Sequence, residues 1–279
     1  LDRGSNDWIV SGSKTASGAS ILSNDPHLSL QSPALFWYIH LNTKRAGGHL
    51  NVEGLGLVGT PGVILGFNDD IAWGVTTANH DVTDVYEEHI TPGTGGAPDT
   101  VAFNSTQVPL DHVTETIHVS GGAPDIVLQL EKVPHHGLVT IDVSGHAVVP
   151  RTATTAYSVR WTGDDPSNEL GCFLGLNLAT SIDEARTSGI HLFEVGAQNF
   201  VVIERASQRI YWSTHARIPV RPAACLTYDP ATGAGTAPMF VLPGDGTCEW
   251  DATPVDDRYV PHDDMPARGF IATANNDLC

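Results

Sequence analysis

Short apolar runs separated by Gly, Pro, Asn and Asp residues dominate the first half of the chain. Such runs are typical of β-strands, which need only about four to eight residues each. The run at 36–39 is apolar at every position, which predicts a strand buried between two layers. We expect strands at residues 8–10, 21–22, 35–41, 71–76, 82–90, 115–119 and 126–133.

Helical periodicity appears only later. Residues 173–178 are mostly apolar and follow the helix-favouring segment 166–169. Ser181 and Glu184 match a capping box, which predicts a second helix that ends near residue 191.

Further strands follow this helical pair. A polar turn joins two expected strands, and a long loop rich in Gly, Pro and Ala precedes a last one. The order of strands, helices and strands predicts an α+β layered fold rather than repeated βαβ units. The two strands lie at 199–204 and 210–213, the loop at 222–246 and the last strand at 269–272.

The composition is typical of a globular protein, and the net charge excludes some classes of binding partner. With 279 residues, the chain can form one large domain or two small ones. Its net charge of -18 argues against nucleic acid and anionic membranes as partners, because an acidic surface repels phosphates, whereas metal cations remain compatible. No apolar run approaches the roughly 20 residues needed to span a bilayer.

The chain start predicts a longer precursor, and the cysteines leave two alternatives open. The start, Leu1-Asp2-Arg3-Gly4, does not match a signal peptide or a natural N-terminus, so we interpret the sequence as a piece of a longer precursor. Cys225 and Cys248 flank the Gly/Pro-rich loop and could form a disulfide in an oxidising compartment; free thiols fit equally well. None of the four cysteines, which include Cys172 and Cys279, belongs to a CxxC pair, and this argues against a zinc site and against a dithiol redox site.

The block 4–14, followed by 23–28, resembles the start of the β-chain of the penicillin acylase family of N-terminal-nucleophile hydrolases. In that family a precursor cuts itself before a Ser. The resemblance therefore implies cleavage between Gly4 and Ser5, with residues 1–4 a residual propeptide and 5–279 the N-terminal portion of the β-chain. Further matches run in family order at 136–137, 157–166, 198–200, 217–219 and 249–250.

The chemistry of such a site follows from its groups. A hydroxyl is a poor nucleophile until a neighbour takes its proton. The α-amine of a terminal Ser5, with a reference pKa of about 7.7–8.0, is partly neutral at working pH and can act as that base. Gly4 has no Cβ, so the backbone can take the strained geometry in which Ser5 Oγ attacks the preceding carbonyl.

Two segments resemble the oxyanion hole of this family. Residues 62–77 match the stretch that ends at the first donor, which assigns the role to the backbone N–H of Thr77. Residues 268–276 match the second active-site strand, which assigns the side-chain amide of Asn275 as the other donor. A fixed donor at such a position lowers the barrier by about 3 kcal/mol.

Other positions carry supporting roles in the family. His27 falls behind the nucleophile, where relatives have Gln or His that organises the α-amine; it is not expected to be a general base. Leu28 and Leu65 correspond to apolar positions of the acyl pocket, with Phe173 nearby, and core packing is the alternative for all three. Aliphatic residues in place of aromatic ones favour an aliphatic acyl group over phenylacetyl.

A calcium site is also implied. Residues 81–84 resemble the segment that binds calcium in the family through the carboxylates of Asp81 and Asp84 and the carbonyl of Thr83. Calcium takes about six to eight oxygen ligands, and the remaining ones come in relatives from another chain and from a later segment. A solvated acidic loop is the alternative.

The resemblance implies part of a four-layer αββα sandwich, with additional β-rich segments. It also implies an amidohydrolase that cleaves linear acyl amides, such as a penicillin side chain or an N-acyl-homoserine lactone. No cofactor takes part in the chemistry. The expected partners are a smaller α-chain and the C-terminal remainder of the same precursor, in the periplasm or outside the cell.

Two rivals remain. The residues 11–14 fit the S-x-x-K motif of penicillin-binding proteins, but Gly12 and Gly18 disfavour the helix it needs, and no S-D-N or K-T-G follows. The other rival is a non-catalytic chain: an unprocessed or truncated precursor, or a calcium-stabilised binding module. The attached residues 1–4 support this alternative, because they block the α-amine of Ser5.

Overall fold

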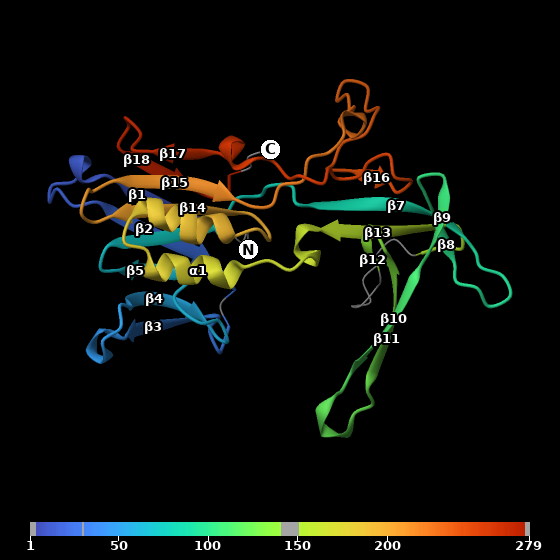
Figure 1. Cartoon of the computed structure of the whole chain (residues 1–279), viewed down its shortest axis with the longest axis horizontal. Coiled ribbons are helices and arrows are strands. Elements are labelled where there is room, and N and C mark those ends of the chain that lie inside the picture. The colour runs from blue at the N-terminus through green and yellow to red at the C-terminus, as the bar shows by residue number, and fades with distance from the viewer. Residues whose placement is uncertain (1–3, 30, 141–150, 277–279) are drawn as a thin grey trace. The chain divides into compact units, whose positions relative to one another are not determined.

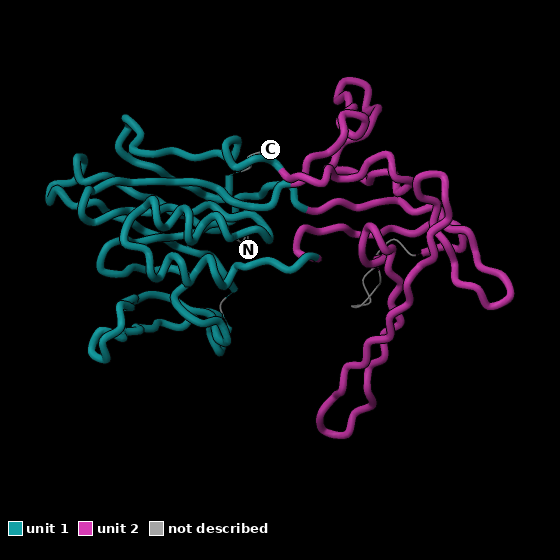
Figure 2. Tube along the Cα trace, viewed as in Figure 1, with its two compact units in different colours: residues 1–82, 165–218, 255–279 teal, residues 83–164, 219–254 magenta. Residues whose placement is uncertain are grey.

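The computed structural model describes residues 4–29, 31–140 and 151–276. The chain forms two compact units (Figures 1 and 2), the first from residues 1–82, 165–218 and 255–279 and the second from residues 83–164 and 219–254. Strands are numerous and helices few in the described residues, so the expected α+β class is confirmed. Of the predicted propeptide segment 1–4, residues 1–3 lie outside the described residues.

A seven-stranded sheet forms the centre of unit 1. One of its faces is covered by helix α1, Glu169–Leu178, and the helical turns that follow it. Trp73, Leu176 and Phe200 are fully buried in the core between these two layers. The strand order is β17 (His262–Asp264), β15 (Ile210–His215), β14 (Gln198–Glu204), β6 (Ile71–Thr77), β5 (Leu65–Asn68), β4 (Asn51–Leu57) and β3 (Phe36–Asn42).

A second sheet of three antiparallel strands packs on the other face of this sheet. Its order is β18 (Phe270–Thr273), β1 (Gly4–Val10) and β2 (Ile21–His27). Ile9 and Ile271 of this sheet contact Val201 and Ile210 of the larger one. Unit 1 therefore stacks a helical layer and two sheets.

The helical pair begins where the sequence predicts it. Asn168 caps α1 by accepting a hydrogen bond from the Gly171 N–H at 3.1 Å. Ser181 Oγ accepts from the Glu184 N–H at 3.2 Å, so the predicted cap is present. The second helix is shorter than expected: α2, Ile182–Glu184, gives way to a π-helical turn at Ala185–Gly189 (η5) and a 3₁₀ turn at Ile190–Leu192 (η6). Thr, Ser and Gly at 187–189 are weak helix formers.

Strand β3 corrects one prediction. The apolar run at 36–39 was expected between two layers, yet β3 is an outer strand of the seven-stranded sheet. Trp37 and Tyr38 are 53% and 68% exposed in this chain. An unbroken apolar run shows that both faces of a strand can be covered, but it does not identify what covers them.

Strands β4 and β5 carry no strand prediction because their glycines look like turn signals. Gly54 and Gly66 instead lie opposite each other in the β4–β5 ladder. A Cβ on Gly66 would lie 2.2 Å from the Glu53 carbonyl oxygen, and Gly54 has a φ of 153°. These glycines therefore allow close backbone approach within a strand.

Unit 2 contains an eight-stranded sheet. Its buried core includes Ile90, Val101, Val133 and Ala156. The spatial order of strands across the sheet is β10 (Asp111–Ile117), β11 (Ile126–Val133), β12 (Gly137–Val139), β13 (Thr155–Trp161), β7 (Thr83–Thr91), β8 (Thr100–Phe103) and β9 (Thr106–Pro109). Strand β16 (Val241–Pro243) pairs with β7 in parallel.

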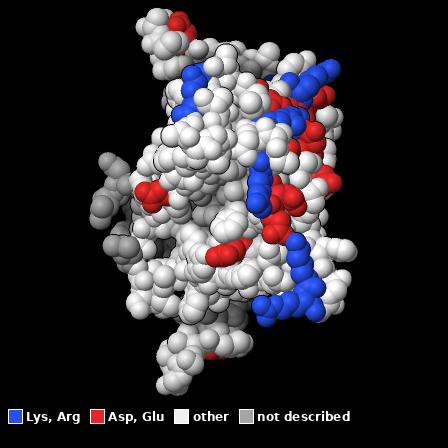
Figure 3. Space-filling view, turned by 90° about the vertical axis from the view of Figure 1, so that its left-hand side faces the viewer, with Lys and Arg blue, Asp and Glu red and all other residues white. Residues whose placement is uncertain are grey.

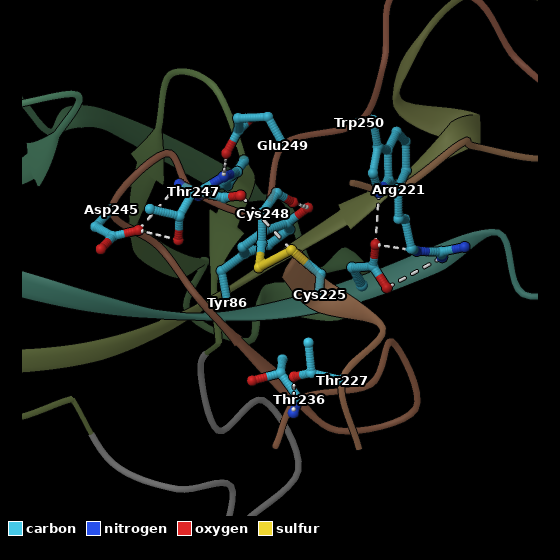
Figure 4. The surroundings of a disulfide bond; sticks show 12 residues. Tyr86, Arg221, Cys225, Thr227, Thr236, Asp245, Thr247, Cys248, Glu249 and Trp250 are labelled. Carbon is cyan, nitrogen blue, oxygen red and sulfur yellow. Dashed lines mark hydrogen bonds and ion pairs between the residues drawn. A yellow bond between two sulfur atoms is a disulfide. The ribbon is translucent and has the colours of Figure 1, made fainter. Parts of the chain in front are cut away.

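A disulfide joins Cys225 and Cys248 in unit 2 (Figure 4), so the structure contains the first of the two cysteine alternatives. The bridge packs against Tyr86, whose hydroxyl donates to the Cys248 carbonyl oxygen at 3.1 Å. Cys172 is a buried free thiol in unit 1, and burial raises its pKa. Cys279 lies outside the described residues.

Charges of both signs lie side by side on the surface. Figure 3 shows Lys and Arg side chains gathered along one part of a face, with Asp and Glu side chains next to them. Ion pairs such as Lys44–Asp69 and Arg209–Asp264 in unit 1 match this arrangement. Among the described residues, no helix has both the length and the apolar character required for crossing a membrane.

Candidate active site

Ser5 lies near the start of β1, the middle strand of the three-stranded sheet. It pairs with Pro26 of β2, and the β1–β18 register places it next to Asn275, just after β18. Side chains alternate across a strand, and the buried Ile9 and Asp7 lie on the same face as Ser5. The Ser5 side chain therefore belongs to the face of β1 that packs toward the seven-stranded sheet.

The predicted cleavage site and oxyanion donors come together in the structure. The Ser5 N–H donates a hydrogen bond to Asn275 Oδ1, and Asn275 Nδ2 donates to the Thr77 carbonyl oxygen at 3.0 Å. A Cβ added to Gly4 would lie 3.1 Å from Asn275 Oδ1, so the glycine permits this close approach. Residues from three distant parts of the sequence thus meet at one peptide bond.

Thr77 ends β6 with its peptide groups directed toward this site. The Ala78 N–H bonds the Ala197 carbonyl at 3.0 Å, and hydrogen-bonded pairs alternate in an antiparallel ladder. Thr77, opposite Gln198, is therefore a non-hydrogen-bonded position whose N–H and C=O point away from the β14 backbone. The N–H assigned as an oxyanion donor lies on the side that Asn275 approaches.

A buried polar network lies between the two sheets beside Thr77. Asn199 Nδ2 donates to the Thr77 carbonyl at 3.1 Å and to Thr76 Oγ1 at 3.1 Å. Thr76 Oγ1 and Thr273 Oγ1 are 2.8 Å apart, and Trp212 Nε1 donates to Asn199 Oδ1 at 3.0 Å. Sequence reasoning gave Asn199 only an architectural match; a polar residue directly before the apolar run 200–203 was the available signal.

His27 pairs with Gly4 in the β1–β2 ladder and lies half-exposed on the alternate face of the strands from Ser5. Its Nε2 is 3.3 Å from Asn6 Nδ2 and 3.2 Å from Asp25 Oδ2. The structure therefore shows contacts to Asn6 and Asp25, and an organising role toward the Ser5 amine stays a prediction.

Asp7 is a buried carboxyl group that sequence reasoning missed. It is 1% exposed, and neither of its oxygens has a hydrogen-bond partner among the described residues. Burial raises the pKa of Asp7 to about 8, and the nearby Trp8 backbone N–H, which does not complete a hydrogen bond to the carboxyl group, offsets only part of the rise. A Cβ on Gly74 would lie 2.6 Å from Asp7 Oδ2, so the glycine of β6 makes room for this group.

Asp7 is expected to make stability fall as pH rises. Its folded-state pKa of about 8 exceeds the unfolded value, so the folded chain keeps a proton that the unfolded chain releases above about pH 4. The Asp7 contribution to the unfolding free energy should fall by roughly 3 kcal/mol between about pH 5 and pH 8, and Asp7→Asn should remove this fall. Urea unfolding at both pH values measures it.

The control for this prediction is Asp25→Asn, since Asp25 lies on the neighbouring strand but its side chain is 73% exposed. It should keep the pH dependence of the wild type. Equal pH dependence in the wild type and Asp7→Asn would show that Asp7 is ionised in the folded chain.

The three acyl-pocket candidates fall in different places. Leu65 is buried and lines a cavity of about 290 Å³ together with Asn24 and Trp73. Leu28 follows β2 and is 42% exposed. Phe173 lies in α1 and packs against the core on the helical face, with its ring 6.2 Å from that of Phe193. The structure therefore places Phe173 on the other side of the sheet from Ser5, and the pocket role of all three stays a prediction.

The calcium candidates include one carboxylate with strong protein partners. Asp84 is fully buried, and its oxygens accept hydrogen bonds from Arg221 Nε at 2.8 Å and Nη2 at 3.1 Å. Trp250 Nε1 also donates to Asp84 Oδ2. The Arg221 guanidinium already neutralises the Asp84 carboxylate, so the described geometry does not favour Asp84 as a calcium ligand. Calcium binding by Asp81, Thr83 and Asp84 stays a prediction.

Ser11, the nucleophile of the S-x-x-K rival, is buried at 3% exposure. It caps the 3₁₀ turn Gly12–Lys14, and its Oγ lies 3.2 Å from Ser13 Oγ. The S-x-x-K chemistry requires the Ser to begin a longer helix, but Ser11 precedes a 3₁₀ turn of only three residues.

The whole chain, residues 1–279, matches the family model described as penicillin amidase. The two stacked sheets and the helical layer of unit 1 have the architecture of the N-terminal-nucleophile hydrolase fold. The chain belongs to the penicillin amidase family.

Curated relatives are acylases. The chain is 26% identical over 278 residues to acyl-homoserine lactone acylase QuiP of Pseudomonas aeruginosa, covering 98% of this chain and 30% of that protein. It is 29% identical over 284 residues to penicillin acylase 2 proenzyme of Pseudomonas sp. strain SE83, covering 98% of this chain and 32% of that protein. The chain thus spans about a third of the length of the relatives it matches.

A solved structure shares the fold. The thermostable penicillin G acylase from Alcaligenes faecalis superposes with a TM-score of 0.79 at 23% identity, covering 98% of this chain and 44% of that one. The predicted fold family is confirmed, and unit 1 contains the helical layer and the two sheets described above.

Proposed function

We propose that this chain carries the catalytic centre of an amidohydrolase that transfers the acyl group of a linear amide to water. The observation that carries the proposal is the contact of Asn275 with both the Ser5 nitrogen and the Thr77 carbonyl. The family membership and the acylase names of the relatives support the same reaction class.

The proposed nucleophile is Ser5 Oγ, activated by its own α-amine after cleavage of the Gly4–Ser5 bond. Cleavage turns the nitrogen that now donates to Asn275 Oδ1 into that amine, so Asn275 would hold the base in place. The amine takes the hydroxyl proton as Oγ attacks the substrate carbonyl, and it returns the proton to the leaving amine. Water then attacks the acyl-enzyme and releases the acid.

The proposed oxyanion hole consists of the Thr77 N–H and the Asn275 amide. An Asn amide has two N–H donors, and the Thr77 carbonyl takes one of them, which leaves the second for the substrate. Asn199 holds the same carbonyl from the other side and so fixes the Thr77 peptide group. Preorganised donors of this kind stabilise the charge that develops on the carbonyl oxygen.

Self-cleavage between Gly4 and Ser5 is part of the proposal. The bond lies against Asn275, and Gly4 lacks the side chain that would obstruct it. One relative is named a proenzyme, which fits activation by processing. We also propose that the chain assembles with a smaller α-chain and the rest of the precursor, that the assembly holds a structural calcium ion, and that it works in the periplasm or outside the cell. The Cys225–Cys248 disulfide supports an oxidising compartment.

The proposed substrates carry an aliphatic acyl group, as in N-acyl-homoserine lactones, rather than phenylacetyl. Leu65 lines the cavity beside Asn24, whose side chain bonds both the N–H and the C=O of Val75 in β6. An aliphatic wall fits a flexible alkyl chain, and the names of several relatives point to the same substrates.

A panel of acyl amides tests this function. The processed full-length protein should hydrolyse medium-chain acyl amides with kcat/KM at least about ten times that for matched phenylacetyl amides, since each buried CH₂ contributes about 0.8 kcal/mol. The panel should hold the leaving amine constant. Faster turnover of phenylacetyl amides would reverse the substrate assignment, and no hydrolysis of any amide would contradict the proposed function.

A further inference from the structure

A cluster of two imidazoles and a carboxylate lies away from Ser5 in unit 1. His191 comes from the 3₁₀ turn η6, His215 ends β15, and Asp257 begins the 3₁₀ turn Asp257–Tyr259 (η8). Asp257 Oδ2 is 2.6 Å from His191 Nδ1, and Asp257 Oδ1 is 3.6 Å from His215 Nε2. One ligand atom from each residue lies within 4.8 Å of the other two.

His215 is oriented as a metal ligand. Its Nδ1 lies 2.5 Å from the Phe193 carbonyl oxygen, which accepts the Nδ1–H and fixes the tautomer with a lone pair on Nε2. The residue is 9% exposed, and Nε2 is buried with no hydrogen-bond partner among the described residues. A buried, unsatisfied nitrogen costs free energy unless a ligand occupies it.

The cluster opens into a cavity of about 410 Å³. Tyr211, which also lines it, packs into the core under the helices, and His215 lies four residues further along the same strand. Because side chains alternate along a strand, both residues face the helical layer. The cavity is therefore on the opposite face of the seven-stranded sheet from Ser5.

The neighbouring cations have other carboxylate partners. Arg186 and Arg258 both line the cavity. Arg186 pairs with Asp183 at 3.9 Å, and Arg258 pairs with Asp256 at 3.5 Å. These contacts leave the Asp257 carboxylate directed to the two imidazoles.

We infer that His191, His215 and Asp257 bind one divalent transition-metal ion of the zinc type. Two imidazole nitrogens and one carboxylate suit zinc, whereas calcium prefers oxygen ligands throughout. Binding at about 2.0–2.2 Å needs His191 to turn from its hydrogen bond with Asp257, and its side chain is 59% exposed and has room to do so. The fourth coordination position faces the cavity.

Metal titration of the full-length protein, stripped with a chelator, tests the inference. We expect one equivalent of Zn²⁺ per chain by calorimetry and elemental analysis, and a visible absorption band when Co²⁺ replaces it. His191→Ala and Asp257→Asn should each weaken Zn²⁺ binding by a factor of about 100. Both side chains are more than half exposed, so these variants should keep the fold, which circular dichroism checks.

The matched control is His118→Ala, because His118 is also paired with a carboxylate, Asp125 at 2.8 Å, but is 82% exposed and lies outside the cluster. It should bind Zn²⁺ as the wild type does. Ser5→Ala should also bind normally, which separates this site from the proposed hydrolytic function. Absence of stoichiometric binding, or equal affinity in the wild type, His191→Ala and Asp257→Asn, would overturn the inference.

Discussion

Replacing Ser5 with Ala is expected to abolish both cleavage of the Gly4–Ser5 bond and hydrolysis of acyl amides. The variant keeps the backbone that contacts Asn275 but lacks the hydroxyl that would attack either carbonyl. Loss of a catalytic nucleophile lowers kcat by a factor of about 10³ or more. Electrophoresis reports the cleavage, and a continuous amide assay reports the hydrolysis.

The control is Ser11→Ala. Ser11 is the other serine that the sequence offers as a nucleophile, and its side chain only caps a short turn. Its loss should cost about 1 kcal/mol of stability and leave kcat within a factor of about two. Hydrolysis retained by Ser5→Ala and lost by Ser11→Ala would reverse the assignment of the nucleophile.

The largest expected effect on stability is that of His136→Ala in unit 2. His136 Nδ1 lies 2.6 Å from Glu88 Oε1, and Nε2 lies 2.7 Å from Glu249 Oε1. Burial lowers the pKa of His136, but the hydrogen bonds to Glu249 and Glu88 outweigh this and raise it above its ordinary value. The imidazole therefore bridges two carboxylates, and its ring stacks on Tyr86 at 3.7 Å.

Removing His136 leaves Glu88, which is fully buried, without its cationic partner. Breaking a buried ion pair in this way costs about 3–5 kcal/mol of unfolding free energy. Urea unfolding at pH 7 measures the change. The exposed His40, whose Nε2 bonds Asn51 Oδ1 at 2.9 Å, supplies the control: His40→Ala should change stability by less than about 0.5 kcal/mol. A similar small change for His136→Ala would show that the bridge contributes little.

The candidate site residues could be assigned from the sequence because they lie in motifs that can be recognised one segment at a time. Ser5, Thr77 and Asn275 each sit in a distinctive stretch, and the structure brings those stretches together at one peptide bond. The general order of strands and helices was also predictable, since amphipathic periodicity and the Ser181 cap are local signals.

What the sequence did not reveal depends on partners distant along the chain. Asp7 looks like a surface residue until the β6 glycine is placed against it. His136 matched a family segment, but its two carboxylate partners lie 48 and 113 residues away. The outer position of β3 likewise follows from strand order, which an apolar run does not encode.

Mass spectrometry of the acyl-enzyme tests the central claim most directly. The active protein is mixed with an activated ester of a medium-chain acid, quenched in acid and digested. We expect the acyl group on Ser5, in a chain whose first residue is Ser5. An acyl group on another residue, or on Ser5 with Gly4 still attached, would contradict the account.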